Sequence, residues 1–231
     1  MTSPSLQREE EPERRKFDTT VGGGTAVEAL VGLGAGILAV LGLAGILPFY
    51  MLSIGIIAAG VALFLEGVSV RTAYAKLSES YGVRTRVTDG AEVAGGFGAQ
   101  SLCGGAAIVL GILALVGVLP GVLLAVGIMA LGAGMLLGGP ARAELEWSEV
   151  ELHHSTDRSR RIASQAVHGS VGMLALFGIG AFILGILALA LQTGSPSLAG
   201  TLLLVGLLAV GATELLSGSA MLGSAAIAAK H

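Results

Sequence analysis

The stretch GILALVGVLPGVLLAVGIMALGAGMLLGG, from Gly111 to Gly139, holds two apolar segments separated by one proline, Pro120. It contains no charged residue. Proline cannot continue a preceding helix, but it suits a turn or the first position of the next helix. A helix needs roughly 20 apolar residues to cross the hydrocarbon core of a bilayer. The stretch therefore predicts two transmembrane helices joined by a tight turn.

The composition of the whole chain agrees with a membrane protein. Of its 231 residues, 53% are hydrophobic and 13% are charged, and 37 are glycine. A soluble domain carries about 25% charged residues, so the chain falls in the membrane class. No basic patch with interleaved aromatic residues occurs, which argues against nucleic acid as a partner.

Five further segments have the length and polarity of the ones around Pro120. Together they predict an all-α integral membrane protein with six transmembrane helices arranged as three tandem hairpins. Each hairpin turn contains one proline: Pro48, Pro120 or Pro196. The six predicted spans are residues 24–47, 49–70, 97–119, 121–139, 168–191 and 198–222.

The charges predict how the hairpins are oriented. All 13 Lys and Arg residues lie outside the three tight turns. Because cytoplasmic segments carry an excess of Lys and Arg, we expect both termini and the long connections in the cytoplasm, with the chain in the inner (plasma) membrane. The predicted segments are a disordered tail (1–20), hairpin 1 (21–78), a cytoplasmic loop (79–93), hairpin 2 (94–140), a second cytoplasmic loop (141–166) and hairpin 3 (167–231).

The hairpins share sequence as well as length. The word GILA begins at Gly36, Gly111 and Gly185. After each turn, glycine recurs at the first, sixth and thirteenth position of a series. These series begin at Gly55, Gly127 and Gly206. A word, a proline and three glycines in one order indicate an internal repeat, a hairpin of about 75 residues present three times.

Small residues predict where the helices touch. Lipid tails are as apolar as leucine, so membrane helices associate through close packing of small side chains. GxxxG pairs and small-xxx-small pairs place such residues on one helix face. The alternative is that these glycines open space for a ligand or a water path. The predicted packing residues are Gly32, Gly36, Gly111, Gly134, Gly138 and Gly185.

Ionisable residues near the ends of the spans are the candidate functional groups. They are Glu28, Glu66, Glu214 and His168. Counted from the turns and the repeat glycines, Glu28 and Glu66 reach the cytoplasmic edge, and Glu214 lies about one turn deeper. Such groups are functional hypotheses by default, because charge inside a membrane is costly. The alternative is that water or nearby basic residues hold these acids at the interface.

Other chemistry is not predicted. The connection with His153 and His154 offers too few ligands for a metal site. The glycine runs lack the lysine of a phosphate-binding loop, and no nucleophile with a matching base appears. We therefore predict a non-enzyme with no cofactor, no metal and no catalytic residue.

The repeat resembles the HdeD family of small bacterial membrane proteins, most clearly from Gly111 to Gly139. The pattern is GILAL, a proline turn, and a helix ending in LLxG. This resemblance implies a six-helix inner-membrane protein associated with acid resistance, with no established catalytic residues to transfer. The chain departs from it in its charged amino-terminal tail and in its connection containing His and Glu.

Three functions are therefore open. The first is an HdeD-like membrane protein acting in acid or envelope stress, or as a membrane scaffold. The second is a small transporter or channel with Glu214 and Glu66 as inner-side gates. The third is an accessory subunit of a membrane complex. The expected partners are the lipid bilayer and either further copies of the chain or a membrane-complex partner.

Overall fold

The computed structural model describes the backbone of residues 29–81, 87–153 and 157–228, and side chains mainly over 29–68, 98–138 and 174–216. This described part of the chain is helical apart from short turns and contains no strand. The first helix is described over Ala29–Leu43. The others are α2 (Pro48–Tyr81), α3 (Val87–Leu115), α4 (Pro120–His153), α5 (Asp157–Leu191) and α6 (Pro196–Ala228).

Five of the helices are long and apolar enough to cross a membrane, which confirms the all-α membrane class. The first helix is apolar but shorter in its described part, so the count of six spans stays a prediction. The apolar spans are Pro48–Val68, Gly98–Leu115, Pro120–Gly138, Leu174–Leu191 and Pro196–Leu216.

The helices extend well beyond these spans, and this differs from the sequence prediction. Most of residues 79–93 and 141–166, expected to be loops, is helical: α2 ends at Tyr81, α3 begins at Val87, and α4 reaches His153. With 34 residues, α2 is about 51 Å long, against a hydrocarbon core of about 30 Å. The physical reason is that Ala, Glu, Arg and Lys are good helix formers, and charge does not end a helix in water.

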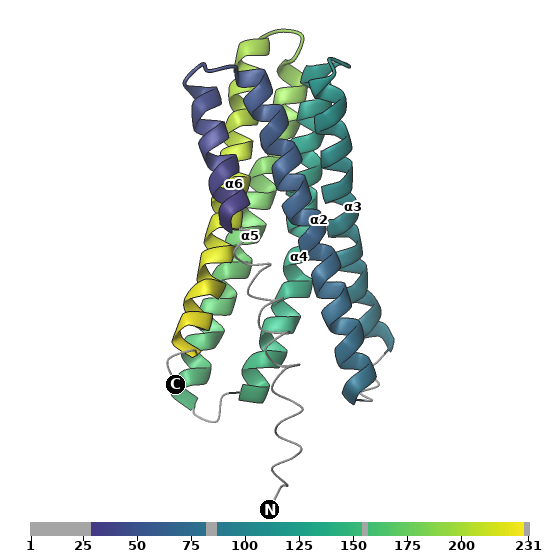
Figure 1. Ribbon diagram of the computed structural model, residues 1–231, viewed down its shortest axis with the longest axis vertical. Helices are drawn as coiled ribbons and strands as arrows, with labels where there is room; N and C mark the ends of the chain where they lie inside the picture. Colours follow the sequence, from purple (N-terminus) through teal and green to yellow (C-terminus); the bar gives the residue numbers. More distant parts are fainter. Residues whose placement is uncertain (1–28, 82–86, 154–156, 229–231) are drawn as a thin grey trace, which may run out of the picture.

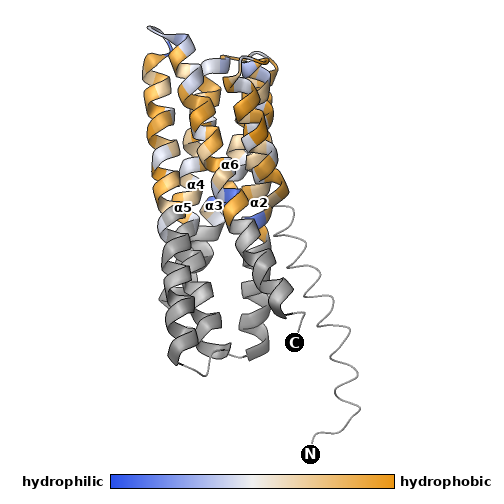
Figure 2. Ribbon diagram, turned by 90° about the vertical axis from the view of Figure 1, so that its left-hand side faces the viewer, coloured by the Kyte–Doolittle hydropathy of each residue, from blue (hydrophilic) through white to orange (hydrophobic). Residues whose placement is uncertain are grey.

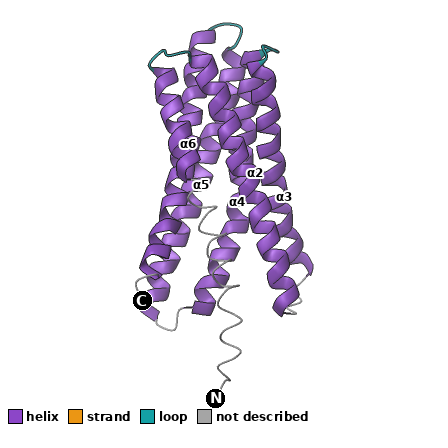
Figure 3. Ribbon diagram, viewed as in Figure 1, coloured by secondary structure: helices purple, strands orange, loops and turns teal. Residues whose placement is uncertain are grey.

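The hairpins form one bundle with its three turns at one end (Figures 1 and 3). We call this the turn end, and the opposite end, toward which the helices diverge in Figure 1, the extended end. Neighbours in the bundle follow chain order from α2 to α6. The inner helices α2, α4 and α6 also contact one another. In their spans 50% of the residues are buried inside the bundle, against 33% in α3 and 28% in α5.

The first two turns share one backbone conformation. Gly45 and Gly117 have positive φ angles of 86° and 96°, which glycine adopts without steric cost. The amide of Ile46 donates to the carbonyl of Leu41, and the amide of Gly45 donates to that of Gly42. This is the Schellman arrangement that ends many helices. Pro48, Pro120 and Pro196 then begin α2, α4 and α6, as the sequence predicts.

The inner helices interlock around a central axis. On each of them the first glycine of the predicted series receives an aliphatic side chain from another inner helix. The pairs are Gly127 with Ile56, Gly206 with Ile128, and Gly55 with Leu207. The three aliphatic residues are fully buried. The cycle α2 to α4 to α6 to α2 is therefore closed, and aliphatic side chains fill the axis at this level.

The sixth glycine of each series makes a different contact, with the outer helix of another hairpin. A Cβ atom at Gly60 would lie 2.8 Å from the carbonyl oxygen of Gly104, and one at Gly132 would lie 2.7 Å from that of Gly178. At Gly211 the corresponding distance to the carbonyl of Gly32 is 2.9 Å. Such distances exclude side chains, so backbone packs on backbone. The third contact joins the first helix to α6 and closes the ring of hairpins.

All six predicted packing glycines lie at helix contacts, but not in the same way. Gly32, Gly111, Gly134, Gly138 and Gly185 turn their missing side chain toward a neighbouring helix. A Cβ atom added at Gly36 would meet no atom within 4 Å, and Gly36 instead contacts α6 through its backbone amide, 2.8 Å from the Cβ position of Gly211.

The physical reason is a shift of register in the first hairpin. Its GILA word lies three residues farther from the turn proline than the word of the second hairpin. The backbone amide of Gly36 packs against Gly211 in the same way as the amide of Ile108 packs against Gly60. Gly36 is therefore equivalent to Ile108, and not to Gly111. The word GILA therefore marks equivalent packing positions in the second and third hairpins, but not in the first.

Candidate functional site

Polar side chains gather where the apolar spans end on the extended side. We call this set the polar layer; it consists of Glu66, Gln100, Ser101, Thr213 and Glu214. Each lies within a few residues of the end of its span on α2, α3 or α6. Figure 2 shows hydrophilic segments at this level, between the orange spans and the grey extensions. Both acids of the described spans therefore lie at one end of the bundle.

Glu66 and Gln100 are joined directly. The amide Nε2 of Gln100 donates a hydrogen bond of 2.9 Å to a carboxylate oxygen of Glu66. Glu66 is half-buried, and Gln100 is only 1% exposed. A hydrogen bond within a protein contributes about 0.5 to 1.5 kcal/mol to stability. The bond connects α2 of the first hairpin to α3 of the second, so the polar layer also links hairpins.

The other end of the Gln100 amide faces α4. Its Oε1 atom lies against Gly138, where a Cβ atom would collide with it. Within the described chain this oxygen accepts no hydrogen bond. A buried acceptor left unsatisfied costs about 1 to 3 kcal/mol. The missing side chain at Gly138 is what admits Gln100 to the interior of the bundle.

Glu214 lies deeper, inside the inner-helix core. It follows Gly211 by three residues, as Leu63 follows Gly60 and Met135 follows Gly132. Leu63 and Met135 are buried, and Glu214 is 4% exposed. Glu214 thus takes a core position that the other two hairpins give to apolar residues.

Close packing of the first helix accompanies Glu214. A Cβ atom at Gly32 would lie 2.9 Å from the backbone carbonyl carbon of Glu214. Because Gly32 has no side chain, the first helix approaches α6 at the level of the acid. Thr213 beside it donates its hydroxyl to the carbonyl of Ala209, at 2.8 Å, so this polar group is satisfied within its own helix.

The remaining predicted residues are not brought into this layer by the described chain. Glu28 lies outside the described residues. His168 lies on α5, but its side chain is outside the described part, as are those of His153 and His154. Cys103 is a half-buried free thiol beside Gly134. Over the described residues, no three metal-ligating side chains come together.

Gln100 is the residue that sequence reasoning missed. Charge within a span singles out ionisable side chains, and the amide of Gln100 is neutral. The available signal was an amide inside the small, apolar run GAQSLCGG, where an uncompensated polar group is costly. A second amide, Gln192 in the third turn, also links hairpins, because its Nε2 donates to the carbonyl of Gly121 at 3.0 Å.

The chemistry open to the polar layer is limited by its groups. The described spans contain two acids, Glu66 and Glu214, and no Lys or Arg. A carboxylate can bind a proton or a cation, and an amide oxygen can coordinate a cation. The polar layer offers no activated nucleophile.

Comparison with protein-family models, with curated proteins and with solved structures finds no significant match. The resemblance to the HdeD family therefore stays a prediction.

Proposed function

We propose that this chain is a non-enzymatic, HdeD-like membrane protein that acts as a scaffold in the membrane during acid or envelope stress. One observation carries the proposal: aliphatic side chains fill the axis of the bundle at the level of Gly55, Gly127 and Gly206. The interlocking residues Ile56, Ile128 and Leu207 are fully buried on the three inner helices. A tightly packed bundle suits a structural role better than the passage of a solute.

The same proposal includes origin and orientation. Three copies of one hairpin account for contacts that recur at Gly60, Gly132 and Gly211. The chain lies in the inner membrane of a bacterium, with the turn end outside and the extended end in the cytoplasm. The distribution of Lys and Arg supports this orientation. Cysteine labelling tests it: an engineered cysteine at Thr193 in the third turn is expected to react with a membrane-impermeant reagent applied from outside.

Deletion of the gene tests the scaffold function. We expect the deletion strain to survive acid less well and to become more permeable, and the wild-type gene to restore both properties. We expect Glu214→Gln to restore them equally, because a scaffold depends on packing and not on the charge of this side chain. Unchanged acid survival and permeability after deletion would contradict the proposal.

A second candidate, a small proton or cation transporter, is favoured by one observation. Glu214 takes a core position that Leu63 and Met135 occupy in the other hairpins, and acids within spans often mark ion pathways. The discriminating measurement is proton and cation flux into proteoliposomes. Transport predicts flux above that of empty liposomes, which is lost in Glu214→Gln. Equal background flux in both proteins would eliminate this candidate.

The third function, an accessory subunit, is separated from these by mass. Purification in mild detergent from the native membrane, followed by mass measurement, is expected to give this chain alone or in multiple copies if it acts as a scaffold. Stoichiometric co-purification of a different membrane protein would favour the accessory role instead.

A further inference from the structure

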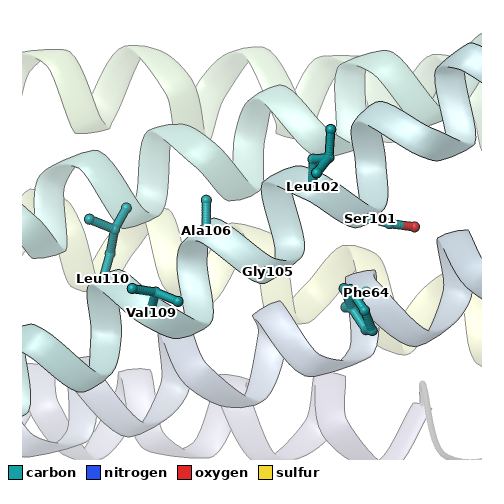
Figure 4. A pocket seen from close by; sticks show the side chains of 7 residues that line it. All are labelled: Phe64, Ser101, Leu102, Gly105, Ala106, Val109 and Leu110. Carbon is teal, nitrogen blue, oxygen red and sulfur yellow. The ribbon is translucent and has the colours of Figure 1, made fainter.

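A shallow apolar groove runs along the outside of the bundle between α2 and α3 (Figure 4). We call it the α3 groove. Its lining includes Phe64 of α2 and, from α3, Ser101, Leu102, Gly105, Ala106 and Val109. These residues belong to the two apolar spans, Pro48–Val68 and Gly98–Leu115. The α3 groove therefore faces the hydrocarbon region of a bilayer.

The groove exists because one side chain is missing from the second hairpin. Gly104, Gly178 and Gly32 make the equivalent inter-hairpin contacts, so the residues that follow them are equivalent too. Those residues are Gly105, Ile179 and Leu33. Ile179 and Leu33 are 48% and 47% exposed, so both cover the outer face of their hairpins.

The flanking residues confirm that this register is correct. Leu102, Leu176 and Leu30 hold the position two residues before those inter-hairpin glycines, and they are 76%, 69% and 68% exposed. The three outer helices therefore present similar faces to the outside, with two adjacent differences. Gly105 stands where the others have Ile179 and Leu33, and Ala106 stands where the others have Gly180 and Gly34. An aliphatic side chain fills this space in two hairpins and is absent from the third.

Close packing does not require glycine at this position. A Cβ atom at Gly105 would make ordinary contact with the Phe64 ring, at 3.7 Å. At Gly104 it would lie 2.7 Å from the carbonyl oxygen of Gly60, so glycine is needed there. A glycine inside a helix costs roughly 1 kcal/mol relative to alanine. Helix packing thus explains Gly104 but not Gly105.

We propose that the α3 groove binds one acyl chain of a membrane lipid, which occupies the space that Leu33 and Ile179 fill elsewhere. The other two hairpins show which kind of group fits this space, namely an aliphatic chain about one side chain wide. From Ser101 to Leu110 the groove runs about 13 Å along the helix. The end at Ser101 is level with the polar layer, where the lipid ester and headgroup would lie. This site is independent of whether the protein is a scaffold or a transporter.

The test is to fill the groove and count bound lipid. The full-length wild type and the variant Gly105→Leu are purified in mild detergent with added bacterial phospholipid, and retained lipid is measured by native mass spectrometry. We expect one phospholipid per chain in the wild type and at least a tenfold lower occupancy in Gly105→Leu. Gly105→Ala, which fills less of the groove, is expected to give an intermediate value and serves if the leucine variant does not fold.

A matched control adds the same side chain elsewhere. Gly180 on α5 has no atom within 4 Å of an added Cβ, so Gly180→Leu places a leucine on the outer face of another hairpin. We expect it to keep the bound lipid. If Gly105→Leu and Gly105→Ala both retain as much lipid as the wild type, the proposal is overturned. If Gly180→Leu also loses the bound lipid, that lipid is part of the general layer around the protein, and the proposal is overturned. A wild-type dimer that Gly105→Leu separates would assign the groove to a second copy instead.

Discussion

The turn-side half of the bundle and the polar layer differ in how closely the three hairpins match one another. Toward the turns, the three hairpins place equivalent residues in equivalent contacts, as with Ile56, Ile128 and Leu207. At the polar layer they differ, because Glu214 lies where the others have Leu63 and Met135. Contacts that hold the ring of hairpins together recur in every hairpin. Each ionisable side chain of the polar layer, in contrast, occurs in one hairpin only.

The largest expected effect comes from breaking a recurring backbone contact. Gly132→Leu would force a side chain into the carbonyl of Gly178, 2.7 Å from the new Cβ atom. We expect a loss of about 3 kcal/mol or more in the free energy of unfolding, since overpacked sites relax poorly. Unfolding by a denaturing detergent measures it.

Gly36→Leu is the matched control for that experiment, because a Cβ atom added at Gly36 would meet no atom within 4 Å. It is expected to change stability by no more than about 0.5 kcal/mol. Equal losses in the two variants would refute the assignment of Gly132 to a backbone contact.

A smaller loss is expected from emptying the axis. Ile128→Ala removes a fully buried side chain that fills the space at Gly206. The expected cost is about 2 to 4 kcal/mol, because a cavity remains. Ile183→Ala on the exposed face of α5 is the control, and its cost should be well below that of Ile128→Ala in the same unfolding assay. Similar costs would argue against a sealed axis.

The next experiment makes the polar layer resemble the rest of the bundle. Glu214→Met gives α6 the residue that α4 has at the equivalent position, Met135. Because an apolar side chain of similar size already fits the equivalent position of α4, we expect stability to change by no more than about 1 kcal/mol. Thermal unfolding in detergent measures it. A loss of more than about 2 kcal/mol would show that the fold requires the acid.

The smallest expected effect concerns the link between α2 and α3. Gln100→Leu, Glu66→Gln and the double variant form a cycle that isolates their interaction, whose hydrogen bond is 2.9 Å long. We expect a coupling energy of about 1 kcal/mol. Replacing Gln100 also removes a buried acceptor, so the single variant should lose less stability than the coupling energy. A coupling energy near zero would mean that the bond contributes nothing to joining the hairpins.

Much of the fold was predictable because membrane helices leave simple patterns. Apolar length predicts the spans, and Pro48, Pro120 and Pro196 predict where helices begin. The helical extensions to Tyr81 and His153 were not predicted, because charge was read as the mark of a loop. In water, a charged segment of good helix formers continues as a helix.

Less of the candidate site was predictable. Glu66 and Glu214 were found because charge in a span is conspicuous. Gln100 was not, because its importance comes from the partners that two other helices supply, Glu66 and Gly138. Gly36 also packs against α6, but not at the position that Gly111 and Gly185 share, since a repeated word need not lie at a repeated position in space.

The sequence by itself determined the class of protein, the hairpin turns and the glycine series, because these depend on local polarity and backbone freedom. Only the tertiary structure decided which helices are inner, which glycines touch and which helix each one faces. It also decided that Gly105 leaves a groove while Gly104 does not. The physical reason is that a glycine has the same local properties everywhere, and its role depends on what another helix places against it.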